Sequence, residues 1–286
     1  TRLIINSHQP LDGPVAWYEA HISSDEGWNM MGGLFPGAPF VFVGFNQNLG
    51  WGMTVNGPDL TDAFKLKINP DNENQYLLDG KWEDFNIKNI KLPVKIFGPI
   101  RWTFNREAKF SKHGLVLETE SGSYSLKFAG MKEIRQADQW FAMNKAQNKQ
   151  EWLEAMKMRA ITSFNAVYAD KEDNIMLLHN TAGPIRNEAY DWSLPVDGTN
   201  SELIWDEITP FNEIPLLVNP KSGWIVSANQ DPFRASAIAD NLKRSDYSPT
   251  LGIETKMTNR AYRVIEIFDN DKKFDEKDLL DAKFDN

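Results

Sequence analysis

The chain has 286 residues, of which 41% are hydrophobic and 25% are charged, a composition typical of globular proteins and not of disordered ones. Its formal net charge of −9, without a basic run, makes it a poor candidate for nucleic-acid binding, which relies on neutralising phosphates. No stretch approaches the roughly 18 apolar residues of a membrane span, and the absence of cysteine excludes disulfides, thiolate catalysis and zinc–cysteine sites.

The first 130 residues are predicted to form strands and turns. The chain opens inside a predicted strand at residues 1–6 and closes just after an amphipathic segment, so we expect it to be a piece of a longer polypeptide. Residues 39–45 are a dense apolar and β-branched run, residues 46–50 predict a turn, and residues 51–55 predict another strand.

Two hairpins are predicted next. Asp79-Gly80 separates the strand-like runs 75–78 and 81–86, and this dipeptide is a strong signal for a two-residue hairpin turn. Residues 109–130 hold two further predicted strands around a turn at 120–122.

The hydrophobic period then changes to that of a helix. Asn148 followed by Glu151 is a capping-box pattern, which predicts a helix that starts near Lys149. A second helix is predicted over residues 258–268, followed by a charged tail at 269–286. The apolar residues at helical spacing before and after Lys149 are Trp140, Phe141, Trp152, Leu153 and Met156.

Strand patterns also return in the second half, at residues 164–169, 175–179 and 223–228, the first two joined by a polar turn. The chain shows no internal repeat and no linker. Residues 1–286 are therefore predicted to belong to one α+β domain in which antiparallel sheet dominates.

The common catalytic and cofactor motifs are missing from the sequence. The histidines His8, His21, His113 and His179 do not pair at metal-ligand spacing. There is no Gly-x-Ser-x-Gly elbow and no glycine-rich nucleotide loop, so neither an elbow-type hydrolase nor a nucleotide-binding protein is supported, although a serine–histidine–aspartate triad stays open.

Three weaker signals each have a functional and a structural interpretation. Asp59 and Asp62 could offer oxygens to a hard cation such as calcium, although their spacing alone favours a solvated turn. Asn229, after the predicted strand 223–228, could donate to a developing oxyanion or form an Asx turn. The ten tryptophans could stack on sugars, but tryptophan is more often part of a core.

Several motifs, in order and at matching separations, resemble the β chain of penicillin acylase-type N-terminal nucleophile hydrolases, the family that includes the acyl-homoserine lactone acylases. They are Asn-Ser-His-Gln-Pro at residues 6–10, Trp-Tyr-Glu-Ala-His at 17–21, Phe-Pro-Gly-Ala-Pro at 35–39, Gly-Phe-Asn at 44–46, Leu-Gly-Trp-Gly-Met-Thr-Val at 49–55, Asp59 with Asp62, Asn-Lys-Gln-Glu-Trp at 148–152, Tyr-Ala-Asp at 168–170, Leu-Pro-Val at 194–196 and Ser-Gly-Trp-Ile at 222–225. The resemblance covers nearly the whole chain.

The resemblance implies an αββα sandwich and hydrolysis of amides that join an acyl group to an amine. The implied nucleophile is a serine that autoproteolysis exposes as a new N-terminus, with its own α-amine as base. In the family this serine lies a strand and a turn before the 6–10 motif, so Thr1 is in the wrong place and the nucleophile is expected upstream of this chain. A periplasmic or secreted location and an α chain from the same precursor are also implied.

The remaining catalytic roles transfer by position. The resemblance gives the oxyanion hole to the Val55 backbone N–H and the Asn229 side chain, and an organising role to Arg260. Gln9 lies where acylases of this family carry Gln or His, with His8 beside it, so which of the two contacts the nucleophile's amine is open.

The binding roles transfer in the same way. A structural calcium is implied, held by Asp59, the Thr61 carbonyl, Asp62, the Trp192 carbonyl and Asp240. An acyl pocket is implied, lined by Pro10, Val43 and Met53. Two alternatives come from other classes of protein, namely a catalytically inactive binding protein on the same scaffold and a sugar-binding β-rich module.

Overall fold

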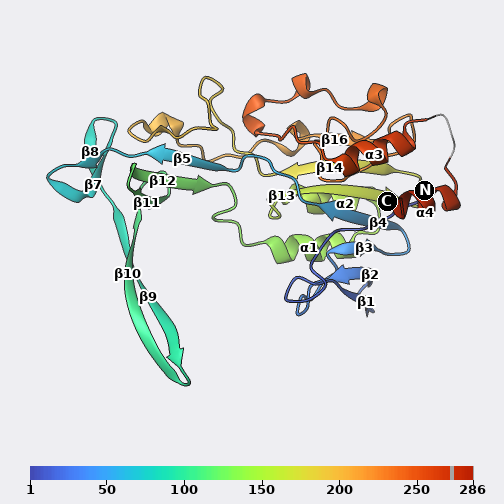
Figure 1. Cartoon of the computed structure of the whole chain (residues 1–286), viewed down its shortest axis with the longest axis horizontal. Helices are drawn as coiled ribbons and strands as arrows, with labels where there is room; N and C mark the ends of the chain where they lie inside the picture. Colours follow the sequence, from blue (N-terminus) through green and yellow to red (C-terminus); the bar gives the residue numbers. More distant parts are fainter. Residues whose placement is uncertain (271–273, 286) are drawn as a thin grey trace. The chain divides into compact units, whose positions relative to one another are not determined.

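The computed structural model describes residues 1–270 and 274–285, which divide into two compact units (Figure 1). One unit comprises Thr1–Pro58, Lys132–Gly183 and Thr209–Asn286, and is called the sheet–helix unit below. The other comprises Asp59–Met131 and Pro184–Ile208, and is called the β unit. The expectation that residues 1–286 form part of one domain of a larger protein stays a prediction.

The sheet–helix unit is built on a seven-stranded sheet in which every neighbouring pair is antiparallel. In spatial order its strands are β1 (Tyr18–Ser24), β2 (Trp28–Leu34), β3 (Val43–Phe45), β4 (Leu49–Thr54), β13 (Ser163–Asp170), β14 (Ile175–Thr181) and β16 (Leu216–Val218). The helices of the unit are α1 (Gln136–Lys145), α2 (Lys149–Lys157), α3 (Asn259–Phe268) and α4 (Glu276–Lys283), with short 3-10 turns at Phe211–Glu213, Ile238–Asp240, Arg244–Asp246 and Pro249–Leu251.

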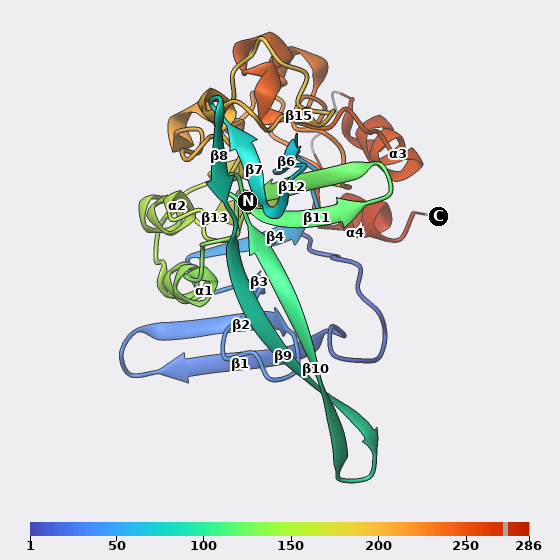
Figure 2. The same ribbon diagram turned by 90° about the vertical axis from the view of Figure 1, so that its left-hand side faces the viewer.

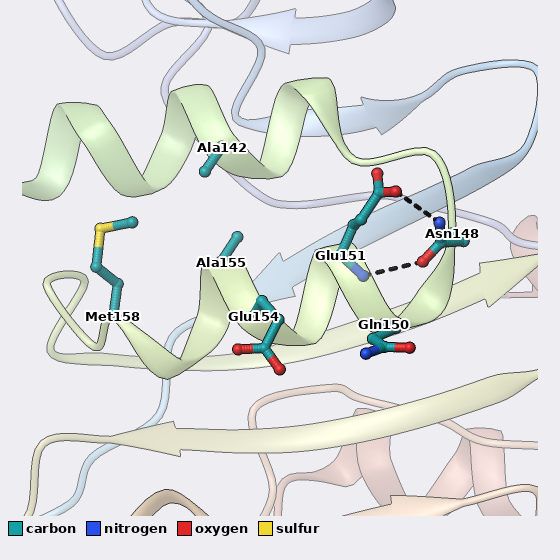
Figure 3. Close-up of a pocket in the computed structure, with 7 residues that line it drawn as sticks. All are labelled: Ala142, Asn148, Gln150, Glu151, Glu154, Ala155 and Met158. Atoms are coloured by element: carbon teal, nitrogen blue, oxygen red, sulfur yellow. Dashed lines mark hydrogen bonds between the residues drawn. The ribbon is translucent and has the colours of Figure 1, made fainter.

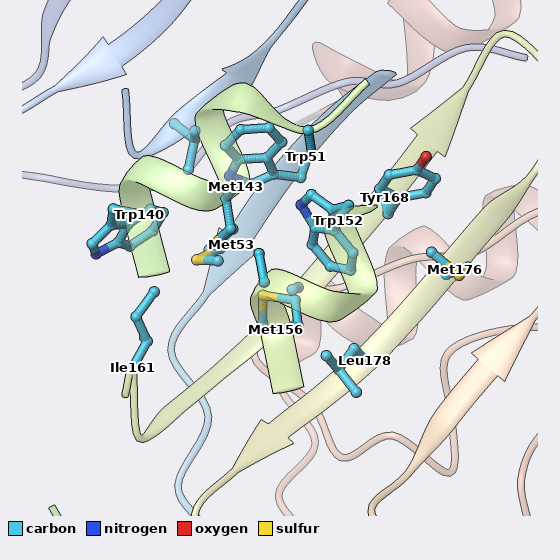
Figure 4. Packing of buried hydrophobic residues seen from close by; sticks show 14 of the residues in the cluster. Trp51, Met53, Trp140, Met143, Trp152, Met156, Ile161, Tyr168, Met176 and Leu178 are labelled. Atoms are coloured by element: carbon cyan, nitrogen blue, oxygen red, sulfur yellow. The ribbon is translucent and has the colours of Figure 1, made fainter. Parts of the chain in front are cut away.

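The two faces of β4 are used differently. One face carries Leu49, Trp51 and Met53, at alternate positions of the strand. These side chains pack with residues of α1 and α2 in the largest hydrophobic core (Figure 4). Gly50 and Gly52 face the other way, and the side chains of Leu3 and Ile5 lie against them. The core members that Figure 4 labels include Trp140, Met143, Trp152, Met156, Tyr168, Met176 and Leu178.

The β unit contains a six-stranded sheet and a three-stranded sheet. In the larger sheet, only the β15–β5 pair is parallel among the described strands. Its strands are β15 (Val196–Asp197), β5 (Thr61–Lys65), β12 (Gly122–Phe128), β11 (Leu115–Thr119), β10 (Ile100–Phe110) and β9 (Asn86–Phe97); the smaller sheet holds β6 (Ile68–Asn69), β7 (Asn72–Leu78) and β8 (Lys81–Asp84), and a 3-10 turn spans Ser201–Leu203. The predicted α+β class with dominant antiparallel sheet is confirmed.

Local signals predicted several of these elements correctly. Asp79 and Gly80 both have positive φ, 49° and 77°, as the turn between β7 and β8 requires. The helix α2 begins at Lys149, and the Asn148 side chain caps it by accepting the Glu151 backbone N–H. The predicted helix at 258–268 is α3, capped by Thr258.

Three strand expectations fail. Residues 1–6 belong to no strand, because Leu3 and Ile5 lie over the glycine face of β4 and the segment does not join the sheet edge. Residues 223–228 also form no strand, and Trp224 and Val226 are buried against α3 instead. The predicted strand at 39–45 is reduced to β3, while Phe40 and Phe42 pack on the core.

Candidate functional site

The end of β4 brings together three of the residues expected to act in catalysis. The Nδ2 atom of Asn229 donates a hydrogen bond to the Val55 carbonyl at 2.8 Å. The Asn229 Oδ1 atom accepts one from Arg260 Nη2 at 2.9 Å. A chain of contacts therefore fixes the orientation of the Asn229 amide, with its oxygen toward Arg260 and its nitrogen toward Val55.

The local structure explains how Asn229 reaches this place. Its backbone has φ of +67°, a left-handed conformation that asparagine tolerates better than most residues. Next to it, Ser227 Oγ lies 2.7 Å from Thr54 Oγ1, which ties the loop to β4. Thr258 Oγ1 donates to the Ala228 carbonyl at 3.3 Å, so the loop is also tied to the start of α3, whose first turn carries Arg260.

This arrangement leaves polar groups where a substrate could reach them. Val55 is 63% exposed, Asn229 is half-buried and Arg260 is exposed. Only one of the two Asn229 Nδ2 hydrogens is used by the Val55 carbonyl. A fixed amide with a remaining N–H donor can stabilise negative charge on an oxygen placed beside it.

A buried polar layer supports the backbone just after Val55. Within it, Asn56 Nδ2 donates to the Asn180 carbonyl at 3.0 Å, and at its exposed edge the Gly57 N–H donates to Glu254 Oε1 at 2.8 Å. His179 is fully buried, and burial lowers its pKa to about 3, so the ring is neutral. Its Nδ1 lies 2.8 Å from Asn165 Oδ1 and its Nε2 lies 3.9 Å from Glu254 Oε2.

The sequence did not indicate this layer. His179 has no histidine partner at metal-ligand spacing, and Glu254 belongs to no motif. The signal in the sequence is the polar run His179-Asn180-Thr181, which ends β14 after four apolar residues.

The N-terminal segment approaches the same end of β4. Ser7 Oγ donates to the Met53 carbonyl at 2.6 Å, and Trp17 Nε1 donates to the Ser7 carbonyl at 2.7 Å. The next three residues, His8, Gln9 and Pro10, are exposed, and the side chains of His8 and Gln9 form no hydrogen bond with another described residue. The choice between His8 and Gln9 therefore stays open.

Thr1 lies at the opposite end of β4. Its Oγ1 donates to Asp173 Oδ1 at 2.6 Å, in the turn that follows Asp170, and Asp170 pairs with Leu49. Since β4 has six residues that each advance the chain by about 3.3 Å, Thr1 and Val55 are separated by about 20 Å.

The residues expected to line an acyl pocket are placed unevenly. Val43 and Met53 are 8% and 5% exposed and belong to the core that faces the helices, whereas Pro10 is exposed. Their role in substrate binding stays a prediction. A pocket that Figure 3 shows beside α2, lined by Ala142, Asn148, Gln150, Glu151, Glu154, Ala155 and Met158, contains no residue expected in the site.

In the β unit, the carboxylates of Asp59 and Asp62 both lie beside the guanidinium of Arg186. Asp62 Oδ2 accepts from Arg186 Nε at 2.9 Å and from Trp205 Nε1 at 2.6 Å, while Asp59 Oδ2 lies 3.5 Å from Arg186 Nη2. Burial raises the pKa of Asp62, and Arg186 opposes this shift. Asp62 Oδ1 is buried without a hydrogen-bond partner among the described residues, so one oxygen remains that a cation could use.

The other expected calcium ligands are less informative. Trp192 is buried in the β unit, with its ring 5.6 Å from the Arg186 guanidinium carbon, and Thr61 starts β5. Asp240 belongs to the sheet–helix unit, where its Oδ2 accepts the Ser222 N–H at 2.7 Å. Within the described residues, no three acidic or histidine side chains gather closely enough to hold a metal by themselves.

Comparisons with known proteins match this chain to penicillin acylases and to acyl-homoserine lactone acylases. A profile described as penicillin amidase matches residues 2–286. Penicillin G acylase from Escherichia coli is 29% identical over 218 residues, covering 75% of this chain and 25% of that protein. The acyl-homoserine lactone acylase PvdQ from Pseudomonas fluorescens (strain Pf0-1) is 25% identical over 224 residues, covering 71% of this chain and 28% of that protein.

A solved structure, a thermostable penicillin G acylase from Alcaligenes faecalis, superposes with a TM-score of 0.77 at 24% identity, covering 93% of this chain and 46% of that chain. This likeness confirms the predicted fold type. The chain spans about a quarter of the length of the two curated relatives.

Proposed function

Because the chain belongs to the penicillin amidase family, we propose that it is part of an amide hydrolase that removes the acyl group from an N-acyl amine. The resemblance seen in the sequence motifs is thereby confirmed. The relatives named above are a penicillin acylase and a lactone acylase, so the proposed substrates are a β-lactam side-chain amide, an acyl-homoserine lactone or an acylated peptide.

The observation that carries the proposal is the contact chain Val55–Asn229–Arg260. In the proposed reaction a serine hydroxyl attacks the amide carbonyl, and its proton passes to the serine's own α-amine. The negative charge then forming on the carbonyl oxygen is stabilised by the Val55 N–H and by the free N–H of Asn229. The C–N bond breaks as the amine leaves with a proton, and water hydrolyses the resulting ester.

We place the serine upstream of Thr1. Leu3 lies against Gly50 and Ile5 against Gly52, while Ser7 bonds to Met53, so residues 3–7 follow β4 in the same direction. A strand that preceded Thr1 and ran antiparallel to this segment would start at the Val55 end of β4. Its first residue would thus lie beside Asn229, whereas Thr1 lies about 20 Å away.

We also propose that calcium binds in the β unit at Asp59 and Asp62, with the carbonyls of Thr61 and Trp192 as further ligands. The unpartnered Asp62 Oδ1 and the oxygen-rich donor set support this assignment. Calcium would stabilise the fold and take no part in the chemistry. A periplasmic or secreted location and an α chain cut from the same precursor complete the proposal.

The tryptophan positions do not favour the sugar-binding alternative. Of the ten tryptophans, only Trp82 and Trp102 are exposed. Six are buried, namely Trp51, Trp140, Trp152, Trp192, Trp205 and Trp224.

In the part of the chain that the structure describes, no helix has the length and apolar character needed to cross a bilayer.

The proposal is tested by expressing the complete precursor and assaying its mature product against amides that differ in acyl group. Release of the amine, together with a covalent acyl adduct on a serine trapped at early times, is the expected result. A correctly matured protein that binds acyl amides without cleaving them would support the inactive binding protein instead.

A further inference from the structure

The strands β9 and β10 form a two-stranded ribbon that extends beyond the rest of its sheet (Figure 2). The pairing of the two strands runs from Asn86 opposite Phe110 to Phe97 opposite Ile100. The other neighbour of β10 is β11, and these two strands pair only where Phe110 lies opposite Leu115. Along most of its length the ribbon therefore has no third strand. Two-stranded ribbons are at best marginally stable in water unless one face is packed.

The two faces of the ribbon differ in character. Residues that pair directly across an antiparallel ribbon share a face, so Leu92 with Phe104 and Val94 with Trp102 form one apolar face. Ile90 lies on the same face, where it pairs with Arg106 at the end of the apolar stripe. These five apolar residues, called the ribbon face below, are between 40% and 64% exposed.

The opposite face is polar and basic. Lys91 pairs with Asn105, and Lys95 pairs with Arg101. All four are exposed. This face suits contact with water, whereas a contiguous exposed apolar stripe of this size marks an interaction surface.

We propose that the ribbon face docks against polypeptide of the same precursor that lies outside this chain. The chain spans about a quarter of the length of the curated relatives. A precursor as long as these relatives would therefore contain several hundred residues besides this chain. The inference depends on the precursor being longer than this chain, and it does not depend on catalysis.

Photo-crosslinking of the mature product of the complete gene tests this directly. The photoreactive residue p-benzoyl-phenylalanine replaces Trp102 on the ribbon face or, as a matched control one residue away, Thr103 on the polar face. Equal amounts of ¹⁴N- and ¹⁵N-labelled protein are mixed before irradiation, and the crosslinked peptides are identified by mass spectrometry. We expect the photoreactive residue at position 102 to crosslink to precursor residues outside this chain. Both peptides of each crosslink should carry the same nitrogen isotope, because they come from one molecule. The photoreactive residue at position 103 should give no crosslinks.

Three results would overturn the proposal. Mixed-isotope crosslinks would assign the ribbon face to a second copy of the chain. Equal labelling from Trp102 and Thr103, or none from either, would mean that no surface covers this face selectively. The third result is binding of the protein to lipid vesicles. If Trp102→Lys abolishes this binding and Thr103→Lys does not, the ribbon face belongs against a membrane.

Discussion

Asn229 is the residue on which the proposed chemistry most depends. Replacement by alanine in the complete enzyme removes the donor to the oxyanion and also the group that Arg260 holds. We expect Asn229→Ala to lower kcat by ~10²–10³ with a much smaller change in KM, because the interaction forms mainly in the transition state. Steady-state kinetics measure this, with Asn89→Ala on the exposed polar face of β9 as the control, and an unchanged kcat would remove Asn229 from the mechanism.

Glu254 is expected to act on stability through the backbone after Val55. Its Oε1 accepts the Gly57 N–H, so Glu254→Ala leaves a backbone donor without its acceptor. Because Gly57 is exposed and water can replace the acceptor, we expect a loss of about 0.5–1.5 kcal/mol in the free energy of unfolding, measured by urea denaturation. Glu254→Gln keeps an oxygen acceptor and should lose clearly less; equal losses in the two variants would show that the Gly57 bond contributes little.

Two buried histidines predict a dependence of stability on pH. Burial lowers the pKa of His179 to about 3 and that of His113 to about 4, from about 6.5 in the unfolded chain. Between these values the unfolded state binds more protons, so stability falls as the pH decreases from about 6.5 to about 4. We expect His113→Gln to flatten this part of the stability profile; a slope equal to that of the parent protein would contradict the assignment.

At the level of elements, the glycine face of β4 positions the N-terminal segment. A Cβ atom added at Gly52 would lie 3.2 Å from both Cγ atoms of Ile5, so one of the two must move. We expect Gly52→Ala to destabilise the protein and Ile5→Ala to remove most of that effect, with a coupling of about 0.5–3 kcal/mol in a double-mutant cycle. Additive losses would mean that residues 1–10 do not rest on β4.

The sequence predicted elements best where the signal was local. The Asp79-Gly80 turn and the Asn148 cap both depend on neighbouring residues, and both were correct. The β9–β10 ribbon was not among the predicted elements, and Pro93 lies in the middle of β9. In β9, an edge strand, the missing proline N–H is tolerated.

The site was predictable only in part, and for the same physical reason. Val55, Asn229 and Arg260 meet although more than 170 positions separate the first two, and no local spacing rule brings them together. The family resemblance singled out these three residues, whereas the buried layer around His179 and Glu254 was not found. Its members are ordinary polar residues whose role depends on tertiary contacts.

For the molecule as a whole, the calcium proposal predicts a response to chelation. A ligand bound only by the folded state raises stability in proportion to the logarithm of its concentration over Kd. We expect a chelator to lower the Tm of the mature protein and added calcium to restore it. In the Asp59→Asn variant the Tm should no longer respond, and a parent protein that melts identically with and without chelator would contradict the calcium site.

The central claim is that these residues form part of an amide hydrolase whose nucleophile is a serine upstream of Thr1. N-terminal sequencing and intact-mass measurement of the natural mature protein test this most directly. We expect a chain that begins with a serine one strand upstream of Thr1. A protein that stays uncleaved at that position, or whose mature chain begins at Thr1, would contradict it.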